Sequence, residues 1–336
     1  MLSRRIARLM LTVAVLLAPG AQAIVRVAVI SDLNGSYGSP GYEAAVSRSI
    51  ARLVELRPDL IISTGDMVAG QRLHPLLSRP VIEAMWQGFH AAVTAPIRSA
   101  RIPFAVTPGN HDASAYPAFA EEREIYRAQW KSRKSGLRFL DAERYPFDYA
   151  FELGDVMFVS LDVTRVGALA PAQHEWLNAA LEKYGSDFRY RVVFSHLPVY
   201  PFTRGRETEV SADHALERLL QRHGVDVYLS GHHHAFYPGY HAGIRYVSQA
   251  CLGAGPRALI GTDRRSERAV TWLEFSDEGV SIDALTGKRL EGRIARETLP
   301  EAITSRFGTL VRDDLFFAGR SPAPVPSRDH AARFNH

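Results

Sequence analysis

Five short motifs in this chain carry side chains that can bind metal ions, and most of them follow a run of apolar, β-branched residues. In chain order they are Asp32-Leu33-Asn34, Gly65-Asp66, Gly109-Asn110-His111-Asp112, His196 and Gly231-His232-His233-His234. Carboxylate, carboxamide and imidazole groups are common ligands of divalent metals. Asp162 is a weaker sixth candidate, which reads more simply as a structural hydrogen-bond acceptor at a strand end. The motifs together indicate a metal site, and we interpret the protein as a hydrolase.

The segments before these motifs are typical of β-strands, and segments with helical periodicity lie between them. We expect strands over residues 25–31, 60–64, 104–106, 149–153, 156–161, 192–195, 225–230, 245–248, 270–275 and 280–284. We expect helices over 43–56, 80–93, 121–130, 173–181 and 212–223. The first part predicts parallel strands and the later part antiparallel pairing, which two packed sheets flanked by helices would satisfy. Ligands bind at the carboxyl ends of the strands in such sheets, so the motifs should converge there.

The order of the motifs resembles that of the calcineurin-like metallophosphoesterase superfamily. The pattern of that superfamily is Asp-x-His, Gly-Asp, Gly-Asn-His-Asp/Glu, a lone His and then Gly-His-x-His. Each motif alone is weak, but this chain carries all five in register from Asp32 to His234, across essentially the whole expected domain. The resemblance implies an α/β fold, a four-layer α/β/β/α sandwich of two mixed β-sheets flanked by helices, as in metallo-dependent phosphatases. It also implies hydrolysis of a small phosphomonoester or phosphodiester.

The resemblance further implies two divalent metal ions, with manganese, iron, zinc and magnesium all left open. Two such ions can share one oxygen bridge, bind a phosphate and hold a hydroxide for in-line attack. Asp66 would bridge the ions. The remaining ligands would be Asn110, His196 and His232 at one site, and Asp32, Asn34 and His234 at the other. His233 would face elsewhere, because it lies between two ligands that alternate in an extended segment.

His111 and Asp112 are the predicted catalytic residues. By the resemblance, His111 binds no metal but lies over the phosphate, where it could protonate the leaving alkoxide or stabilise the transition state. Asp112 follows it directly and is expected to orient its ring, as an outer-shell acid often does.

Asn34 is the one departure from the superfamily pattern, which has a histidine there. A carboxamide oxygen can still bind a metal, but more weakly than an imidazole. Three outcomes stay open: a weaker site that prefers manganese, magnesium or iron, a site completed by water, or loss of that metal. Purple acid phosphatases also lack this histidine, but they supply a tyrosine three residues after the second aspartate. Ala69 occupies that position here, which disfavours a purple acid phosphatase.

Aromatic and cationic residues near the motifs are candidates for substrate binding. Tyr37 lies in a glycine-rich loop after the first motif, and Tyr200, Arg204 and Arg206 follow His196 closely. Such groups could stack on a leaving group or pair with phosphate oxygens.

Two other functions compete with a phosphoesterase. A non-catalytic metal- or phosphate-binding protein could keep the fold with an impaired first metal site, although retention of His111 argues against it. The same metal pair could also hydrolyse a non-phosphate ester or amide. The chain offers no Gly-x-Ser-x-Gly turn near a histidine and an acid that would indicate a serine hydrolase.

The ends of the chain predict export and one large domain. Residues 1–23 have the basic start, apolar stretch and small-residue cleavage site of a signal peptide cleaved after Ala23. The protein is therefore expected in the periplasm, with the twin-arginine pathway as one route and no stable membrane span after cleavage. Residues 24–286 would form the metallophosphoesterase domain, 287–319 a C-terminal extension that packs on it, and 320–336 a disordered tail.

Charge and cysteine content exclude several classes of protein. The formal charge of +4 falls to +1 without residues 1–23, which hold three arginines and no acid. The composition therefore gives no electrostatic case for a nucleic-acid partner. Cys251 is the single cysteine, so internal disulfides and cysteine-based metal sites are excluded. The oligomeric state is left open by the sequence.

Overall fold

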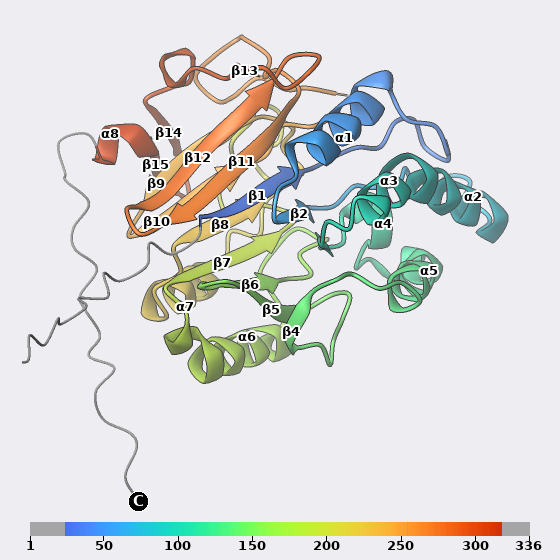
Figure 1. The fold of residues 1–336 in the computed structure, drawn as a ribbon, viewed down its shortest axis with the longest axis horizontal. Coiled ribbons are helices and arrows are strands. Elements are labelled where there is room, and N and C mark those ends of the chain that lie inside the picture. The colour runs from blue at the N-terminus through green and yellow to red at the C-terminus, as the bar shows by residue number, and fades with distance from the viewer. Residues whose placement is uncertain (1–23, 254, 318–336) are drawn as a thin grey trace, which may run out of the picture.

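A computed structural model describes residues 24–253 and 255–317, which form two β-sheets packed face to face between layers of helices (Figure 1). The predicted α/β/β/α architecture is therefore confirmed. The expected signal peptide, 1–23, and the expected tail, 320–336, lie outside the described residues. None of the described helices combines the length and hydrophobicity that a membrane span requires.

The first sheet has six strands in the order β13-β12-β11-β1-β2-β3. Its three leading strands are parallel, and β11 and β12 continue the sheet in antiparallel fashion. The segments that follow β1, β2 and β3 therefore leave at the same edge. The strands are β1 (Val25–Ile30), β2 (Leu60–Ser63), β3 (Phe104–Val106), β11 (Ala269–Ser276), β12 (Gly279–Thr286) and β13 (Gly292–Arg293).

The second sheet has nine strands in the order β14-β15-β9-β10-β8-β7-β6-β5-β4. Its centre, from β6 to β8 and β10, is parallel. Ser195 at the end of β7 pairs with Ser230 at the end of β8, so His196 and Gly231 leave the sheet at the same level. The strands are β4 (Arg138–Asp141), β5 (Tyr149–Leu153), β6 (Val156–Ser160), β7 (Tyr190–Ser195), β8 (Val227–Ser230), β9 (Tyr237–His241), β10 (Ile244–Ser248), β14 (Ala302–Ser305) and β15 (Gly308–Arg312).

Helices cover the outer face of each sheet. α1, α2, α3 and α5 pack on the first sheet, and α6 and α7 on the second (Figure 1). α4 carries the Asn110 motif, and the predicted helix over 80–93 continues from α2 through a π-helical turn, His90–Thr94, into α3. The bounds are α1 (Ala44–Leu56), α2 (Arg79–Phe89), α3 (Ala95–Ser99), α4 (Asn110–Ala113), α5 (Ala120–Lys131), α6 (Pro171–Tyr184), α7 (His214–Arg222) and α8 (Asp313–Phe317).

The alternation of side chains along each strand divides the core into three layers. Val27 and Val29 of β1 point into the layer between the sheets, whereas Ala28 and Ile30 pack against the helices of the first sheet. The second sheet repeats this division between the inner layer and the layer beneath α6 and α7. Because successive residues of a strand face opposite sides, an apolar residue at nearly every position is what a strand buried on both faces requires.

Several strands escape the sequence prediction. β4 is a short edge strand with exposed and polar residues, and β9 contains Pro238 and Gly239, which are usually depleted in strands. Residues of the expected C-terminal extension supply β13 to the first sheet and the β14–β15 hairpin to the second, next to β9. The described end of the chain therefore adds strands to both sheets.

Candidate metal centre

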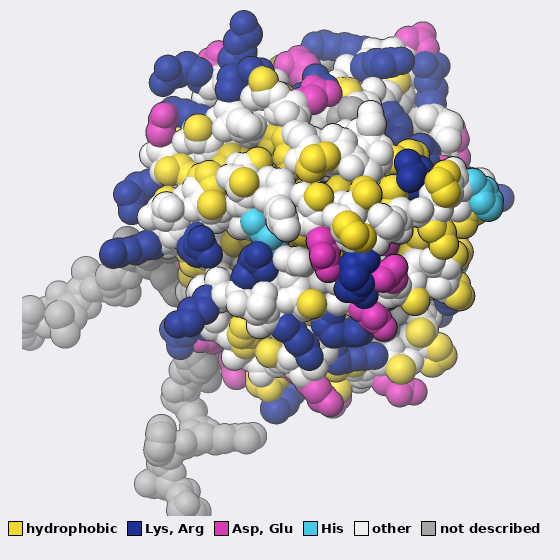
Figure 2. Space-filling view, turned by 90° about the vertical axis from the view of Figure 1, so that its right-hand side faces the viewer, with side chains coloured by type: hydrophobic (Ala, Val, Ile, Leu, Met, Phe, Trp, Pro, Cys, Tyr) yellow, Lys and Arg dark blue, Asp and Glu magenta, His cyan; other side chains and the backbone are white. Residues whose placement is uncertain are grey.

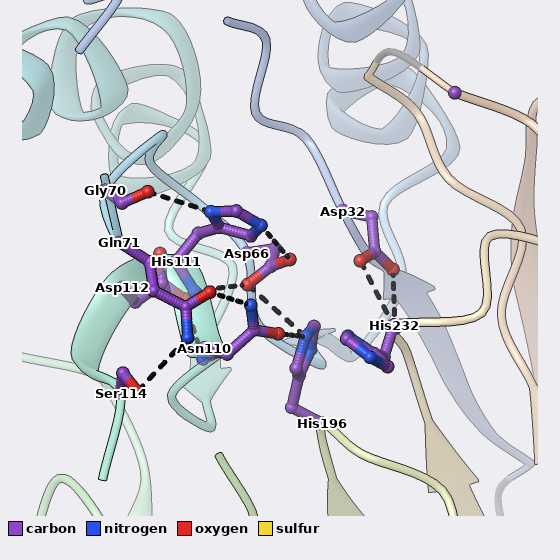
Figure 3. Close-up of polar contacts among 12 residues, drawn as sticks. Asp32, Asp66, Gly70, Gln71, Asn110, His111, Asp112, Ser114, His196 and His232 are labelled. Atoms are coloured by element: carbon purple, nitrogen blue, oxygen red, sulfur yellow. Dashed lines mark hydrogen bonds and ion pairs between the residues drawn. The ribbon is translucent and has the colours of Figure 1, made fainter. Parts of the chain in front are cut away.

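The candidate metal centre lies at the seam between the two sheets, where the carboxyl ends of strands from both sheets meet. Asp32, Asp66 and Asn110 follow strands of the first sheet, whereas His196 and the segment 232–234 follow strands of the second. In Figure 3 the side chains of Asp66, Asn110 and His196 point toward one another from these different segments. A cavity of about 230 Å³ opens above them. The structure therefore brings together residues that are up to 202 positions apart in the chain, Asp32 and His234.

Four of these residues have a left-handed backbone, which is uncommon outside glycine. The φ angles are 50° for Asp32, 54° for Asp66, 65° for His232 and 54° for His234. Such a conformation costs roughly 1–3 kcal/mol per residue and persists where the surroundings enforce it. The backbone N–H of Asp32 donates to Gly65 O at 3.0 Å, and that of His232 donates to the Asp32 carboxylate at 3.1 Å. The strain turns each side chain out of its strand and into the seam.

Gly109 is required because the loops after β2 and β3 touch at this point. A Cβ atom on Gly109 would lie 2.0 Å from the backbone nitrogen of Asp66 and 2.2 Å from its Oδ1. Any larger residue would therefore push the two loops, and the ligands that they carry, apart.

The His196 group consists of Asp66, Asn110, His196 and His232. Nε2 of His196 lies 2.9 Å from Oδ1 of Asn110 and 3.3 Å from Oδ1 of Asp66. Nδ1 of His196 donates to Thr64 O at 2.8 Å, so a neutral ring has its lone pair on Nε2. A lone pair facing two oxygen acceptors is unfavourable unless a cation lies between them. This geometry fits a divalent metal.

Gln71 fixes the orientation of the Asn110 carboxamide. Nδ2 of Asn110 donates to Oε1 of Gln71 at 2.6 Å, and Nε2 of Gln71 donates in turn to Oγ of Ser114 at 3.2 Å (Figure 3). The amide oxygen of Asn110 is therefore the atom that faces His196. Sequence analysis missed Gln71, because nothing in its local sequence signals a contact with a residue in the next loop.

The His234 group consists of Asp32, Asp66 and His234, with Asn34 as its predicted fourth member. Nε2 of His234 lies 3.0 Å from Oδ1 of Asp32, while its Nδ1 donates to Gly255 O at 3.0 Å. A neutral ring therefore also points its lone pair at a carboxylate. The Asn34 side chain lines the cavity, and among the described residues it has no side-chain hydrogen-bond partner.

Asp66 belongs to both groups. Its carboxylate lies within 4.8 Å of ligand atoms of His196 and His232 on one side, and of Asp32 and His234 on the other. The side chain is only 2% exposed. Burial alone would raise the pKa of Asp66, but His196 and His111 outweigh it and hold the pKa below its usual value. The shared position fits a carboxylate that bridges two ions.

The electrostatics of the seam also fit bound cations. Among the described residues, the ion-pair partners of Asp32 and Asp66 are all histidines. Burial opposes protonation of His196 and His234, yet the aspartates raise their pKa values to about 9 and about 10. The buried carboxylates of Asp32 and Asp66 thus require neighbouring positive charge, which either protons or divalent metals can supply. Buried aspartates, neutral imidazoles and a carboxamide are a donor set suited to transition metals.

His111 lies beside the cavity and outside both groups. Its Nδ1 donates to Gly70 O at 2.8 Å, which leaves Nε2 on the cavity side, 3.9 Å from Oδ2 of Asp66. Its backbone N–H donates to Oδ1 of Asp66 at 2.9 Å. The ring can therefore exchange a proton with a bound molecule while its backbone holds the shared carboxylate.

Asp112 does not orient the His111 ring, which corrects the predicted role. Its carboxylate accepts hydrogen bonds from the backbone N–H groups of Met67, Val68 and Gly109, each at 2.8 Å. The Gly70 carbonyl, rather than a carboxylate, sets the orientation of His111. Asp112 instead ties the loop after Asp66 to the turn before Asn110. Burial raises its pKa to about 7.

Two residues that sequence analysis missed, Glu209 and Arg257, complete the other side of the centre. Oε2 of Glu209 lies 2.8 Å from Nε2 of His232 and also pairs with Arg206. This contact occupies Nε2 of His232 and leaves Nδ1 as the ring atom available to a metal. Burial is the main cause that lowers the pKa of His232 to about 4, so the ring is neutral at neutral pH. Arg257 donates to the backbone O of His232 at 2.7 Å.

His233 faces away from the centre, as the alternation predicts. Its Nδ1 accepts from the backbone N–H of Phe202 at 3.0 Å, and its Nε2 donates to Glu209 O at 3.1 Å. Both ring nitrogens of a neutral imidazole are thereby satisfied, so His233 holds the ligand loop in place. Asp162 likewise pairs with Arg123 and accepts from Thr164, which fits its structural interpretation.

The four predicted substrate-binding residues separate into two pairs. Tyr37 and Arg206 line the cavity. Tyr200 is 2% exposed, donates its hydroxyl to Glu217 and packs on Tyr246, and it is absent from the cavity wall. The Arg204 guanidinium pairs with Asp263 at the surface, 2.5 Å away, and also lies outside the cavity wall. The structure therefore turns Tyr200 and Arg204 away from the centre.

Comparison with known proteins identifies the family to which the chain is similar. The model of the calcineurin-like phosphoesterase family matches residues 25–236. The chain is 30% identical to purple acid phosphatase 18 of Arabidopsis thaliana over 155 residues, or 45% of this chain and 34% of that protein. It is also 30% identical to purple acid phosphatase 22 of the same plant over 181 residues, or 53% of this chain and 38% of that protein. The chain thus spans about a third of the length of these curated relatives.

A solved structure shares the fold at low sequence identity. The purple acid phosphatase PPD1 from yellow lupin (Lupinus luteus) seeds superposes with a TM-score of 0.61 and 17% identity, covering 83% of this chain and 54% of that protein. Ala69 disfavours a purple acid phosphatase, yet proteins of that name are among the relatives that match. Ala69 itself is buried, at 1% exposure.

Proposed function

The chain belongs to the calcineurin-like phosphoesterase family, and from this premise we propose that it is a metal-dependent hydrolase of phosphomonoesters or phosphodiesters. The observation that carries the proposal is the position of Asp66 between two groups of potential ligands. A pair of divalent ions held there would neutralise phosphate oxygens and activate water for in-line attack. The donor sets are Asp66, Asn110, His196 and His232 for one ion, and Asp32, Asn34, Asp66 and His234 for the other.

The protein's own residues would contribute orientation and a proton. Gly70 O holds Nδ1 of His111, so Nε2 is the atom that can donate a proton to the departing alkoxide. Arg206 lines the same cavity, where its guanidinium can pair with a phosphate oxygen while Glu209 holds it.

We also propose that the protein acts after export. The support is the signal-peptide pattern of residues 1–23, with cleavage after Ala23 and the periplasm as the destination. A protein in that compartment would meet external phosphoesters. Sequencing the N-terminus of the protein recovered from a periplasmic extract tests this, because an intact Met1 would contradict export by cleavage.

The first experiment combines metal content with turnover. The purified protein is stripped of metal and refilled separately with manganese, zinc, magnesium and iron, then assayed with p-nitrophenyl phosphate and bis(p-nitrophenyl) phosphate. We expect about two metals per chain and turnover of at least one ester. Two bound metals without turnover of either ester would contradict the proposal.

A second candidate is a non-catalytic member that binds metal or phosphate. The observation that favours it is Asn34, which has no side-chain partner among the described residues at the position where the family has a histidine. In that case the stripped protein would take up one metal per chain, and phosphate would bind without any ester being hydrolysed. The metal titration and the assay above distinguish the two candidates.

A further inference from the structure

Three exposed apolar side chains line the cavity that contains His111. Tyr37, Val166 and Tyr116 are 55%, 47% and 44% exposed, and all three line this cavity. They come from three separate loops, after β1, β6 and α4. Single exposed apolar side chains are ordinary, whereas a cluster at the mouth of a polar site marks a surface that a ligand covers.

Cationic side chains line the same cavity. Arg206 and Arg257 line it, and they contact Glu209 and the backbone of His232 respectively. Figure 2 shows one face of the molecule, on which hydrophobic, cationic and acidic side chains are interspersed. The lining of the cavity therefore combines exposed apolar side chains with three arginines, and one of these, Arg165, directly precedes Val166.

The position of His111 indicates which part of a substrate would contact these apolar side chains. Its ring centroid lies 5.4 Å from that of Tyr37, with the two planes inclined by 45°. If His111 donates the proton to the departing oxygen, the group bonded to that oxygen must lie within reach of Tyr37. The arginines of the lining are then left for the non-bridging phosphate oxygens.

Resting on the proposed function, we propose that the preferred substrates are phosphoesters with a planar aromatic leaving group, held between Tyr37, Tyr116 and Val166. Two tyrosine rings and a β-branched side chain offer flat apolar contacts, which suit an aryl or heteroaryl ring better than a small alkyl group. No covalent step is added, since the leaving group departs with the proton from His111 as before.

The test compares two inhibitors that cannot be hydrolysed, phenylphosphonate and methylphosphonate, on the metal-loaded protein. Both carry the same anionic head, so the ratio of their inhibition constants isolates the contribution of the ring. We expect Tyr37→Ala to weaken phenylphosphonate about 5- to 10-fold and methylphosphonate by less than about 2-fold. Tyr37→Phe should restore the wild-type ratio, because it keeps the ring and removes only the hydroxyl.

Tyr116→Ala and Val166→Ser extend the test to the other two loops. Each should lower the preference for phenylphosphonate, by about 2- to 5-fold. Leu315→Ala is the matched control, because Leu315 is a similarly exposed apolar residue, at 40%, on α8 outside the cavity wall. Its ratio should stay at the wild-type value. Equal weakening of both phosphonates, or an unchanged ratio in all three variants, would overturn the proposal.

Failure of the proposed function is a separate outcome. If the wild-type protein hydrolyses no ester, calorimetric titration with the two phosphonates replaces the inhibition assay. A preference for the phenyl compound that is lost in Tyr37→Ala would then support the aromatic subsite in a binding protein. Absence of that preference in a protein that does hydrolyse esters would reject the subsite alone.

Discussion

The two ligand groups that share Asp66 differ in how completely the protein arranges them. In the His196 group, the second polar atom of each terminal ligand is already engaged: His196 by Thr64, Asn110 by Gln71 and His232 by Glu209. In the His234 group, His234 is held by Gly255, but the Asn34 side chain has no partner among the described residues. Outer hydrogen bonds orient ligands and raise metal affinity. The His196 group is therefore prearranged for metal binding, whereas the His234 group depends on the orientation that the Asn34 side chain adopts.

The largest expected effect comes from replacing Asp66, the residue that the two groups share. Asp66→Asn should lower metal content from about two to below one per chain and reduce turnover by roughly 10³-fold or more, because both ions lose a ligand. Elemental analysis and steady-state kinetics measure this. Asp263→Asn is the control, since that carboxylate is 92% exposed and outside the cavity wall. Retention of two tightly bound metals in Asp66→Asn would break the idea of a shared ligand.

His111→Ala should separate chemistry from metal binding. We expect turnover to fall by roughly 10²- to 10⁴-fold, with metal content unchanged, because His111 belongs to neither ligand group. Parallel measurement of metal content and turnover on one preparation decides the point. Equal loss of metal and activity would mean that His111 holds an ion.

Gln71 offers a test confined to the prearranged group. Gln71→Leu should weaken one metal site by about 10- to 100-fold, because the Asn110 carboxamide loses the acceptor that fixes its oxygen. Gln71→Glu keeps that acceptor and should restore affinity. Stepwise calorimetric titration of the stripped protein reports each site. An equal decrease at both sites in Gln71→Leu would contradict a role restricted to the His196 group.

Asn34 tests the less prepared group. Asn34→His should tighten the weaker site by about 10-fold, since an imidazole is the stronger ligand for transition metals. Asn34→Ala should weaken it by a similar factor if the carboxamide oxygen binds metal. If Asn34→Ala left both dissociation constants unchanged, Asn34 would not be a ligand.

The smallest expected effect concerns Glu122, which holds the backbone of Gln71. Glu122 accepts from the backbone N–H of Gln71 at 2.9 Å, and burial raises its pKa from 4.5 to about 7. The folded carboxyl thus keeps its proton to higher pH than the unfolded one, so the free energy of unfolding falls as pH rises from about 4.5 through about 7. Glu122→Gln should remove about 1–2 kcal/mol of that decrease. Urea titrations of both proteins at pH 5 and pH 8 measure the difference, and an identical pH dependence would contradict it.

The fold was predictable because the sequences of its central strands are typical of buried β-strands. Segments such as 60–64 and 192–195 are apolar on both faces, and the helices between them carry regular apolar spacing. β9 was not predictable, since Pro238 and Gly239 oppose a strand and only pairing with β10 and β15 forms it. Tertiary pairing overrides local preference there.

The candidate site was predictable only where residues closely follow strand ends. The predicted metal ligands come within four residues of the end of a strand, and parallel strands carry them to a common edge. Gln71, Glu209 and Arg257 lie within loops, and their contacts depend on how neighbouring loops meet. Tyr200 shows the converse, because its closeness to His196 in sequence says nothing of the direction in which the loop turns it.

The division of ligands between the two sheets bears on when a metal can be acquired. Neither ligand group is complete until His232 and His234 have folded against the N-terminal strands, so a growing or unfolded chain offers no finished site. If the proposed export occurs with the chain unfolded, the ions must come from the destination. If it occurs with the chain folded, they come from the cytoplasm, whose metal pool is different. The compartment in which the segment with His232 and His234 folds would therefore determine which metal ions are bound.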